Sequence, residues 1–250
     1  MTNNLKAVIL AAGKGTRLQS ETAQIPKAMR KAAGKPMLDY VLKSVDFIEN
    51  KKDITIVVGY LKDMIIDSFP EYAFAIQNEQ LGTGHAVKCA EQAIGEYDGD
   101  VLVLMGDMPL ITRETLLNLL HEHRSGNNDC TNLSCEIDET LALGRILRDK
   151  NNNFREIIEN RDCTDEQRKI KEYNTGNAVF NSKKLFAQLA HLKNNNKSGE
   201  YYLTDIPKIF LENNYRVGLY KSENANEIHG ITSAEDLEYI EKILIANSTK

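Results

Sequence analysis

The stretch KAVILAAGKGTRLQSETAQIPKAM, from Lys6 to Met29, joins a short apolar run to a glycine-rich turn. The unbroken apolar residues 7–12 predict a strand that is buried on both faces of a sheet. In the turn, Gly13 and Gly15 allow close backbone approach, and their N–H groups can form a nest for an anion. Three basic residues belong to the same stretch, namely Lys14, Arg17 and Lys27.

Neither of the two common glycine-loop motifs fits this turn. The Walker pattern G-x-x-x-x-G-K-[ST] is absent, and Leu18 occupies the position of the third Rossmann glycine. Taken alone, the glycines are equally compatible with a tight strand-to-helix connection. The spaced cations Arg17 and Lys27 favour a phosphate site, because a structural turn does not need them whereas a triphosphate does.

Apolar runs and amphipathic stretches alternate through the first half of the chain. Further strands are predicted at residues 54–58, 73–76 and 101–105. Helices are predicted at residues 37–47, 61–69, 83–93 and 112–124, with Thr112 as an N-cap. This rhythm predicts an α/β fold, a Rossmann-like and mostly parallel mixed sheet with helices on both faces.

The rhythm changes after Ser125. Strands are predicted at residues 130–137, 144–148, 154–158, 173–180 and 216–220. Helices are predicted from Thr164, at residues 183–193 and 202–213, and after a capping pair of Ser233 and Asp236. Because no repeat or long linker is present, we expect one domain over residues 1–250. It divides into halves at 1–125 and 126–230, with a C-terminal helix at 231–250.

Composition excludes several classes of protein. The 250 residues are 42% hydrophobic, enough for a sizeable core, and the net charge of −5 argues against a nucleic-acid-binding surface. The four cysteines form no C-x-x-C pair, so we expect reduced thiols and no zinc site. No apolar run is long enough to cross a membrane, so a cytoplasmic protein without a membrane partner is expected.

Two more loops follow predicted strands, where ligands bind in open parallel sheets. In QNEQLGTGHA, Gln77 offers an amide to a base edge, and Gly82 and Thr83 open a helix whose N–H groups are available to a ligand. His85 is expected to pack or cap rather than to catalyse. In MGDMP, Asp107 is read either as a magnesium ligand beside phosphates or as a turn residue before a proline.

Together these motifs resemble a known enzyme family. LAAGKGTR, QLGTGHA, GD-x-PL, GRI, EYNTGN and GEYYLTD occur in the order found in the uridylyltransferase domain of bacterial N-acetylglucosamine-1-phosphate uridylyltransferase. The resemblance runs from about Leu5 to Ile206 and implies the nucleotide-diphospho-sugar transferase type of fold. Bifunctional members of this family continue into a left-handed β-helix acetyltransferase domain, which this sequence does not include.

The resemblance also implies roles for individual residues. Arg17, Lys27 and Asp107 would be catalytic, the two cations on the triphosphate and Asp107 on Mg²⁺. The nucleotide would be bound by Leu10, Ala11, Ala12, Gly13, Gly15, Gln77, Gly82 and Thr83. The sugar would be bound by Gly106, Gly144, Glu159, Asn174 and Thr175. Thr232 stands where the family has an asparagine as second metal ligand, and a hydroxyl is a poorer ligand.

The implied reaction is attack by a sugar 1-phosphate, expected to be N-acetylglucosamine 1-phosphate, on the α-phosphorus of UTP, releasing pyrophosphate. Both substrates are small anions, so catalysis would rest on positioning and charge neutralisation. Met105 and Leu143 replace tyrosines of the family, which leaves a different nucleotide or sugar open. A catalytically weakened nucleotide-sugar-binding protein is the alternative of another class. The sequence leaves the oligomeric state open.

Overall fold

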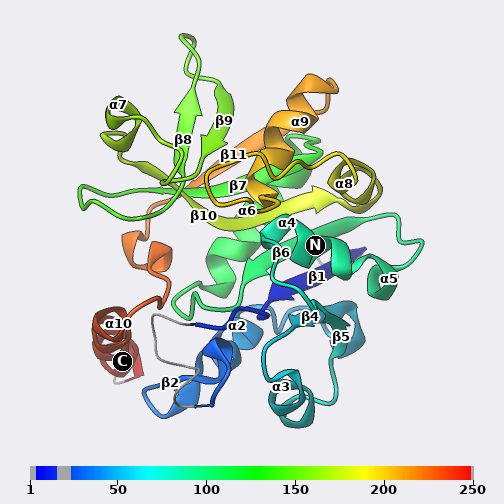
Figure 1. Ribbon diagram of the computed structural model, residues 1–250, viewed down its shortest axis with the longest axis vertical. Helices are drawn as coiled ribbons and strands as arrows, with labels where there is room; N and C mark the ends of the chain where they lie inside the picture. Colours follow the sequence, from blue (N-terminus) through cyan, green and yellow to red (C-terminus); the bar gives the residue numbers. More distant parts are fainter. Residues whose placement is uncertain (1–3, 16–23, 249–250) are drawn as a thin grey trace.

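A mixed sheet forms the centre of the computed structural model, which describes residues 4–15 and 24–248 (Figure 1). In this part of the chain the sheet has nine strands. Seven lie in the order β11 (Val217–Ser222), β7 (Cys130–Glu136), β10 (Glu172–Asn181), β6 (Asp100–Met105), β1 (Leu5–Leu10), β4 (Ile54–Val58) and β5 (Ala73–Ile76). The strands β8 (Arg145–Arg148) and β9 (Phe154–Ile158) form an antiparallel hairpin beside β10.

Strand β1 is the central strand of the nucleotide half. It runs parallel to β4 and β6, and β4 runs parallel to β5. The antiparallel strand β10 then joins β6 to β7. The mostly parallel mixed sheet predicted from the sequence is therefore confirmed.

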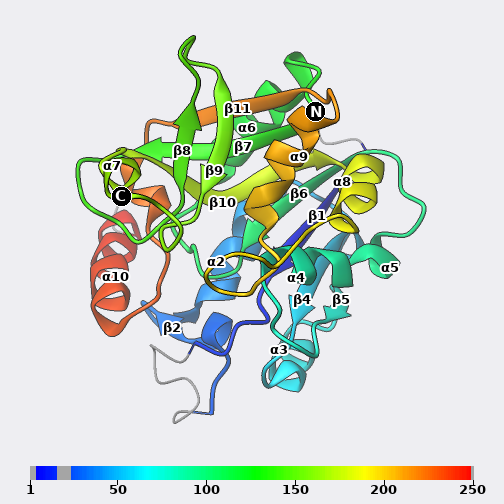
Figure 2. The same ribbon diagram turned by 45° about the horizontal axis from the view of Figure 1, so that its top comes forward.

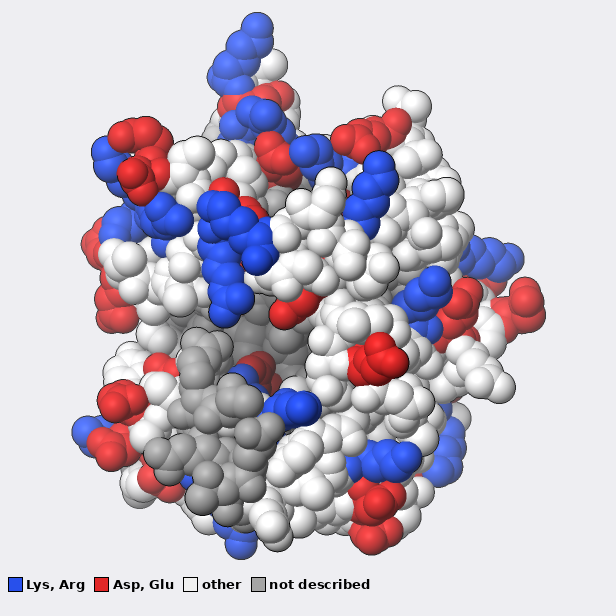
Figure 3. All heavy atoms as spheres, in the orientation of Figure 1, with Lys and Arg blue, Asp and Glu red and all other residues white. Residues whose placement is uncertain are grey.

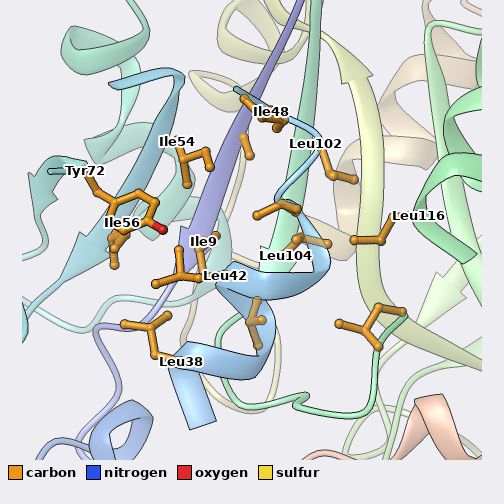
Figure 4. Packing of buried hydrophobic residues seen from close by; sticks show 14 of the residues in the cluster. Ile9, Leu38, Leu42, Ile48, Ile54, Ile56, Tyr72, Leu102, Leu104 and Leu116 are labelled. Atoms are coloured by element: carbon orange, nitrogen blue, oxygen red, sulfur yellow. The ribbon is translucent and has the colours of Figure 1, made fainter. Parts of the chain in front are cut away.

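Two apolar layers lie on opposite faces of the sheet, because successive strand residues point to opposite sides. Ile9, Ile56 and Leu104 belong to the layer under α2 (Met37–Ser44), α3 (Lys62–Ser68) and α6 (Arg113–Ser125). Figure 4 shows this packing, with Leu38 and Leu42 of α2 over Ile9. The opposite layer lies under α4 (Thr83–Cys89), α5 (Glu91–Ile94), α8 (Ser182–Leu189) and α9 (Ile206–Glu212). Each fully buried aliphatic side chain contributes about 1.5–3 kcal/mol relative to exposure.

The remaining elements lie at the margins of the sheet. The short helix α7 (Asp165–Arg168) begins with a capping box of Thr164 and Gln167. The C-terminal helix α10 (Ala234–Ser248) lies beside the small hairpin of β2 (Lys31–Ala32) and β3 (Lys35–Pro36) in both views (Figures 1 and 2). Single 3₁₀ turns are η2 (Lys27–Met29), η3 (Lys51–Asp53), η4 (Leu203–Asp205) and η5 (Ala225–Ile228). No helix in the described part of the chain has the length and apolar character that crossing a bilayer requires.

Several predicted boundaries were wrong for local reasons. The first strand ends at Leu10. The N–H of Ala11 still donates to the carbonyl of Val57 in β4 at 2.9 Å. The predicted helix at 83–93 is divided into α4 and α5 at Ala90. The N–H of Ala90 donates to the carbonyl of Val87, three residues back, instead of four. The predicted helix at 37–47 ends at Ser44, and the one at 202–213 begins as η4. The β2–β3 hairpin was missed because its strands lack β-branched and aromatic residues.

The predicted helix caps are confirmed. Thr112 accepts a hydrogen bond from the N–H of Thr115 at the start of α6. Ser233 and Asp236 exchange hydrogen bonds before α10, as a capping box requires. Pro207 lies in the first turn of α9, where a missing N–H costs nothing.

The start of α6 is held by a buried carboxylate. Glu227 is 1% exposed, and its Oε1 accepts from the N–H and hydroxyl of Thr112 and from the hydroxyl of Thr115. Its Oε2 accepts from the hydroxyl of Ser222 at 2.9 Å. Glu227 thus fastens η5 and the end of β11 to the first turn of α6.

We predict that E227Q destabilises the protein. The glutamine amide cannot accept from every donor around it, and a buried donor left without a partner costs about 1–3 kcal/mol. Urea denaturation should therefore show a lower free energy of unfolding for E227Q. The exposed neighbour supplies the control E223Q, which should unfold like the wild type. Equal stability of all three proteins would contradict the role given to Glu227.

Asp205, directly before α9, carries a partly buried carboxyl. The pKa of Asp205 is raised to about 6, mainly by burial; Lys208 lowers it, and the charges of Asp162 and Glu156 add to the rise. Because the folded-state pKa lies above the usual value of 3.8, the folded state favours the protonated form. Stability from this group is therefore present below about pH 4 and is lost as the pH rises through about 6.

We predict that D205N stabilises the protein at pH 8 and leaves its stability at pH 4 unchanged. The neutral amide avoids the cost of a partly buried charge, which is about 1–2 kcal/mol after allowance for solvent screening. The measurement is urea denaturation at intervals from pH 4 to pH 8. The matched control is D67N on the exposed face of α3, which should not change the slope with pH. A D205N curve parallel to that of the wild type would refute the assignment.

Candidate functional site

A cavity of about 220 Å³ opens at the carboxyl ends of β1, β5 and β6. Figure 3 shows a hollow at the centre of this face, with basic and acidic side chains at its edge. Most of the residues predicted for the nucleotide and for catalysis line the cavity. They are Leu10, Ala11, Ala12, Gly13, Lys27, Gln77, Gly82, Thr83 and Asp107; Gly106, predicted for the sugar, also lines the cavity. Arg17 lies outside the described residues.

The strand ends meet by backbone contact, which explains the small residues there. The N–H of Gly106 donates to the carbonyl of Leu10 at 3.0 Å, and a Cβ on Gly106 would lie only 2.7 Å from that oxygen. A larger residue at position 106 would therefore push the end of β6 away from β1. Gly15 has a φ of +65° and does not line the cavity.

Gly82 holds the second loop against a distant segment. Its φ of +112° suits glycine, and a Cβ there would lie 2.5 Å from the carbonyl oxygen of Tyr201. The Nε2 of Gln77 donates to the carbonyl of Gly82 at 3.1 Å and meets the Nδ1 of His85 at 3.1 Å. The amide hydrogens of Gln77 are thereby engaged, so its oxygen is the group that can accept from a ligand. His85 packs behind the loop, as expected.

Lys27 and Asp107 form an ion pair in the cavity. Lys27 lies at the start of η2 and Asp107 directly after β6, and their side chains are 18% and 22% exposed. The N–H of Ile231 donates to the carbonyl oxygen of Asp107 at 2.9 Å, which fixes the loop from behind. Two predicted catalytic residues from distant segments are therefore in direct contact.

Thr232 lies next to this loop, but its hydroxyl donates to the Oδ2 of Asp236 at 2.7 Å. Its side chain thus helps to begin α10. Among the described residues, no group of three or more histidine, cysteine, aspartate or glutamate side chains is placed to hold a metal ion. Asp107 presents a carboxylate to the cavity beside Lys27, and Glu200 also lines the cavity. The Asp107 carboxylate fits Mg²⁺, which usually takes one or two carboxylates and completes its shell with substrate phosphates and water.

Three of the predicted sugar-binding residues lie together beyond β6, at the β8–β9 hairpin. The N–H of Asn174 donates to the carbonyl of Gly144 at 2.9 Å, and a Cβ on Gly144 would lie 3.6 Å from the Oε2 of Glu159. Asn174 is 5% exposed, and its Oδ1 has no hydrogen-bond partner among the described residues. Burial raises the pKa of Glu159, while the hydroxyl of Thr204, 2.8 Å from its Oε1, lowers it.

Thr175 belongs to the framework of this cluster. Its buried hydroxyl donates to the carbonyl of Leu133 at 3.0 Å and accepts from the N–H of Asn177. The register of β10 against β7 shifts here, between Asn174 and Ala178. In that irregularity, Asn177 accepts from the N–H of Met105, and Gly176 lies close to the Met105 side chain. Met105 itself lines the cavity, so the shift shapes the wall between the two subsites.

Residues 197–204, here called the strap, connect the nucleotide loop with the sugar cluster. The N–H and carbonyl of Tyr201 bond to Leu81 and Gly84, both at 2.8 Å. The N–H of Leu203 donates to the hydroxyl of Thr83 at 3.0 Å, and Thr204 then reaches Glu159. The motif GEYYLTD contributed to the resemblance, yet no role was predicted for Tyr201 or Thr204. Their partners lie far away in sequence, so only the fold shows these contacts.

Comparison with known proteins identifies a family and several relatives of this chain. Residues 7–205 match the family model of the MobA-like NTP transferase domain. The bifunctional protein GlmU of Streptococcus mutans is 42% identical over 98% of this chain and 52% of its own length. The GlmU protein of Streptococcus thermophilus is 40% identical over 95% of this chain and 51% of its own length. The chain thus spans about half the length of the curated relatives that it matches.

A solved structure shares the fold. It is a Bacillus anthracis protein assigned as a glucose-1-phosphate thymidylyltransferase and solved with sucrose. The TM-score is 0.72 at 19% identity, and the match covers 96% of this chain and 94% of that one. The predicted fold class is therefore confirmed, and the GlmU relatives confirm the predicted resemblance to the uridylyltransferase domain. Because the family model covers most of its length, the chain belongs to the family of MobA-like NTP transferase domains.

Proposed function

We propose that this domain transfers a uridylyl group from UTP to a sugar 1-phosphate, with N-acetylglucosamine 1-phosphate as the expected acceptor. The observation that carries the proposal is the Lys27–Asp107 pair, which lies between the glycine-lined end of β1 and the wall of Met105. A phosphate-binding cation and a metal-binding carboxylate at one point suit phosphoryl chemistry. The GlmU relatives, similar over almost the whole chain, support the choice of substrates.

The two halves of the chain would divide the binding of substrates. Residues 1–125 supply β1, β5 and β6, whose ends would hold the nucleotide, with the oxygen of Gln77 accepting from the base. Residues 126–230 supply Gly144, Glu159 and Asn174 for the sugar, and residues 231–250 add the helix behind Asp107. We place this activity in the cytoplasm, where UTP and sugar phosphates are the available substrates.

The buried acceptors of the second half suit a sugar with an N-acetyl group. The Oδ1 of Asn174 requires a donor, because a buried polar atom without a partner is costly. A sugar hydroxyl or acetamido N–H would provide one. The carboxyl of Glu159, fixed by Thr204, offers a second oxygen to a neighbouring hydroxyl.

Charge neutralisation is the main catalytic task for the protein. Magnesium bound at Asp107 would polarise the α-phosphate and offset the charge that builds up there. Lys27 would exchange its contact with Asp107 for a phosphate oxygen, because both contacts lie within reach of one flexible ammonium group. The attacking phosphate is already ionised at neutral pH, so no protein base is required.

We expect pyrophosphate release with UTP and N-acetylglucosamine 1-phosphate, and little release with other pairs. The measurement is a matrix of nucleoside triphosphates against sugar 1-phosphates in the presence of Mg²⁺. D107N, which keeps the shape of the side chain, should remove most of the activity. Release with thymidine or cytidine triphosphate only would overturn the uridine assignment. No release with any pair, together with UTP binding, would favour the binding protein of the alternative hypothesis.

We also predict that K27M lowers kcat/KM by about 30- to 1000-fold, equivalent to about 2–4 kcal/mol of lost transition-state stabilisation. The loss should appear mainly in kcat, because the charge that Lys27 offsets grows during the reaction. The matched control is K31M, in which an exposed lysine of β2 loses its charge close to η2. Unchanged kcat/KM for K27M would contradict a phosphate contact by Lys27.

A further inference from the structure

Arg145 is a buried cation without an acidic partner. Its side chain is 0% exposed, and no carboxylate among the described residues forms an ion pair with it. Its Nε–H is buried and has no hydrogen-bond partner in the described part of the chain. Burying an unpaired guanidinium is costly, and arginine is almost never fully buried unless paired. Its position therefore calls for an explanation.

The guanidinium is held by carbonyl groups and by a ring. Its Nη1 donates to the carbonyl of Leu143, and its Nη2 donates to the carbonyl of Arg168 at the end of α7. The charge lies over the ring of Tyr173 at 4.3 Å from the ring centre. A desolvated cation over an aromatic face is attracted strongly, which offsets part of the cost of burial.

Tyr173 extends this attachment along the loop of residues 139–143. Its hydroxyl donates to the carbonyl of Glu139 at 2.8 Å and accepts from the N–H of Leu141 at 3.3 Å. Arg145 and Tyr173, here called the clamp, thus hold this loop and the end of α7 from one side of the β8–β10 pairing. Figure 1 shows α7 beside β8, where these segments meet.

The other side of the same pairing carries the sugar cluster. Gly144 precedes Arg145 and Asn174 follows Tyr173, so each clamp residue is the chain neighbour of a residue predicted to bind the sugar. Arg145 is paired with both Tyr173 and Ile158, and Glu159 comes directly after Ile158. Side chains of successive strand residues point to opposite faces. Each clamp residue is therefore next to the backbone of a sugar-cluster residue, and within β10 the side chain of Tyr173 points away from that of Asn174.

We propose that Arg145, together with Tyr173, is a positioning residue for the sugar subsite. This inference rests on the proposed function and adds residues that would never touch the substrate. Binding geometry depends on the supporting side chains behind the contact residues. The unfavourable burial of Arg145 would then be retained because it holds Gly144, Glu159 and Asn174 in one arrangement.

The test compares R145K and R145M with the wild type in pyrophosphate release. We expect KM for the sugar 1-phosphate to rise about 10-fold or more, with KM for UTP and kcat changed less than about 2-fold. R145K should be less impaired than R145M, because the ammonium group keeps the charge. A general loss of folding would instead lower the amount of active enzyme and leave both KM values alone.

The matched control is R148M on the same strand. Arg148 forms an ion pair with Glu172 of β10 and does not bond to residues 139–143. R148M should leave both KM values unchanged. Y173F keeps the ring but loses both bonds to the loop, so its KM for the sugar 1-phosphate should rise in a protein that still folds. If the arginine variants fail to fold, Y173F decides the test.

Three outcomes would overturn the proposal. The first is that R145M changes the KM for UTP as much as the KM for the sugar 1-phosphate. The second is that R145M or Y173F has the wild-type KM for the sugar 1-phosphate. The third is that R148M raises the KM for the sugar 1-phosphate as much as R145M does. Calorimetric titration with the sugar 1-phosphate separates this inference from the proposed function. A wild type that releases no pyrophosphate refutes the function and the inference with it. An active wild type, with sugar affinity unchanged in the clamp variants, refutes the inference alone.

Discussion

The parallel pairing of β1 with β6 is the constraint on which the site depends. The register places Leu10 opposite Met105, so both strands end at the same level. The bond from Gly106 to Leu10 continues the contact one residue further. The glycine turn and the loop of Asp107 consequently leave the sheet side by side. Lys27 and Asp107 meet in the cavity at this edge, and a small residue is needed at position 106, where the two backbones touch.

The second half of the chain is joined to this edge through the strap and through β10. Strand β10 runs antiparallel to β6, and its irregular register at residues 174–178 brings Asn177 against the backbone of Met105. The strap contacts the nucleotide loop at Gly84 and the sugar cluster at Glu159. The two proposed subsites therefore share supporting contacts through the hydrogen bonds of the strap.

Patterns among neighbouring residues predicted the strands and helix caps well. Contacts between residues far apart in the sequence could not be predicted from such patterns. Apolar runs indicated β1, β4 and β6, and the cap residues Thr112 and Ser233 were placed correctly because caps involve neighbours in sequence. The burial of Arg145 had no such signal, since a charged residue in a strand is normally expected at the surface. The engagement of the Gln77 amide and the contact of Thr204 with Glu159 depend on how distant loops meet.

The Lys27–Asp107 pair also bears on which anions the cavity accepts. Without substrate, each charge compensates the other in a partly buried place. A bare phosphate ion can gain Lys27 only by taking it from Asp107, which would leave a carboxylate uncompensated beside a second negative charge. A triphosphate that arrives with its own divalent cation brings a replacement for the ammonium group. At the proposed site, the pair would therefore favour a metal-bound triphosphate over inorganic phosphate before any contact with a base or a sugar is made.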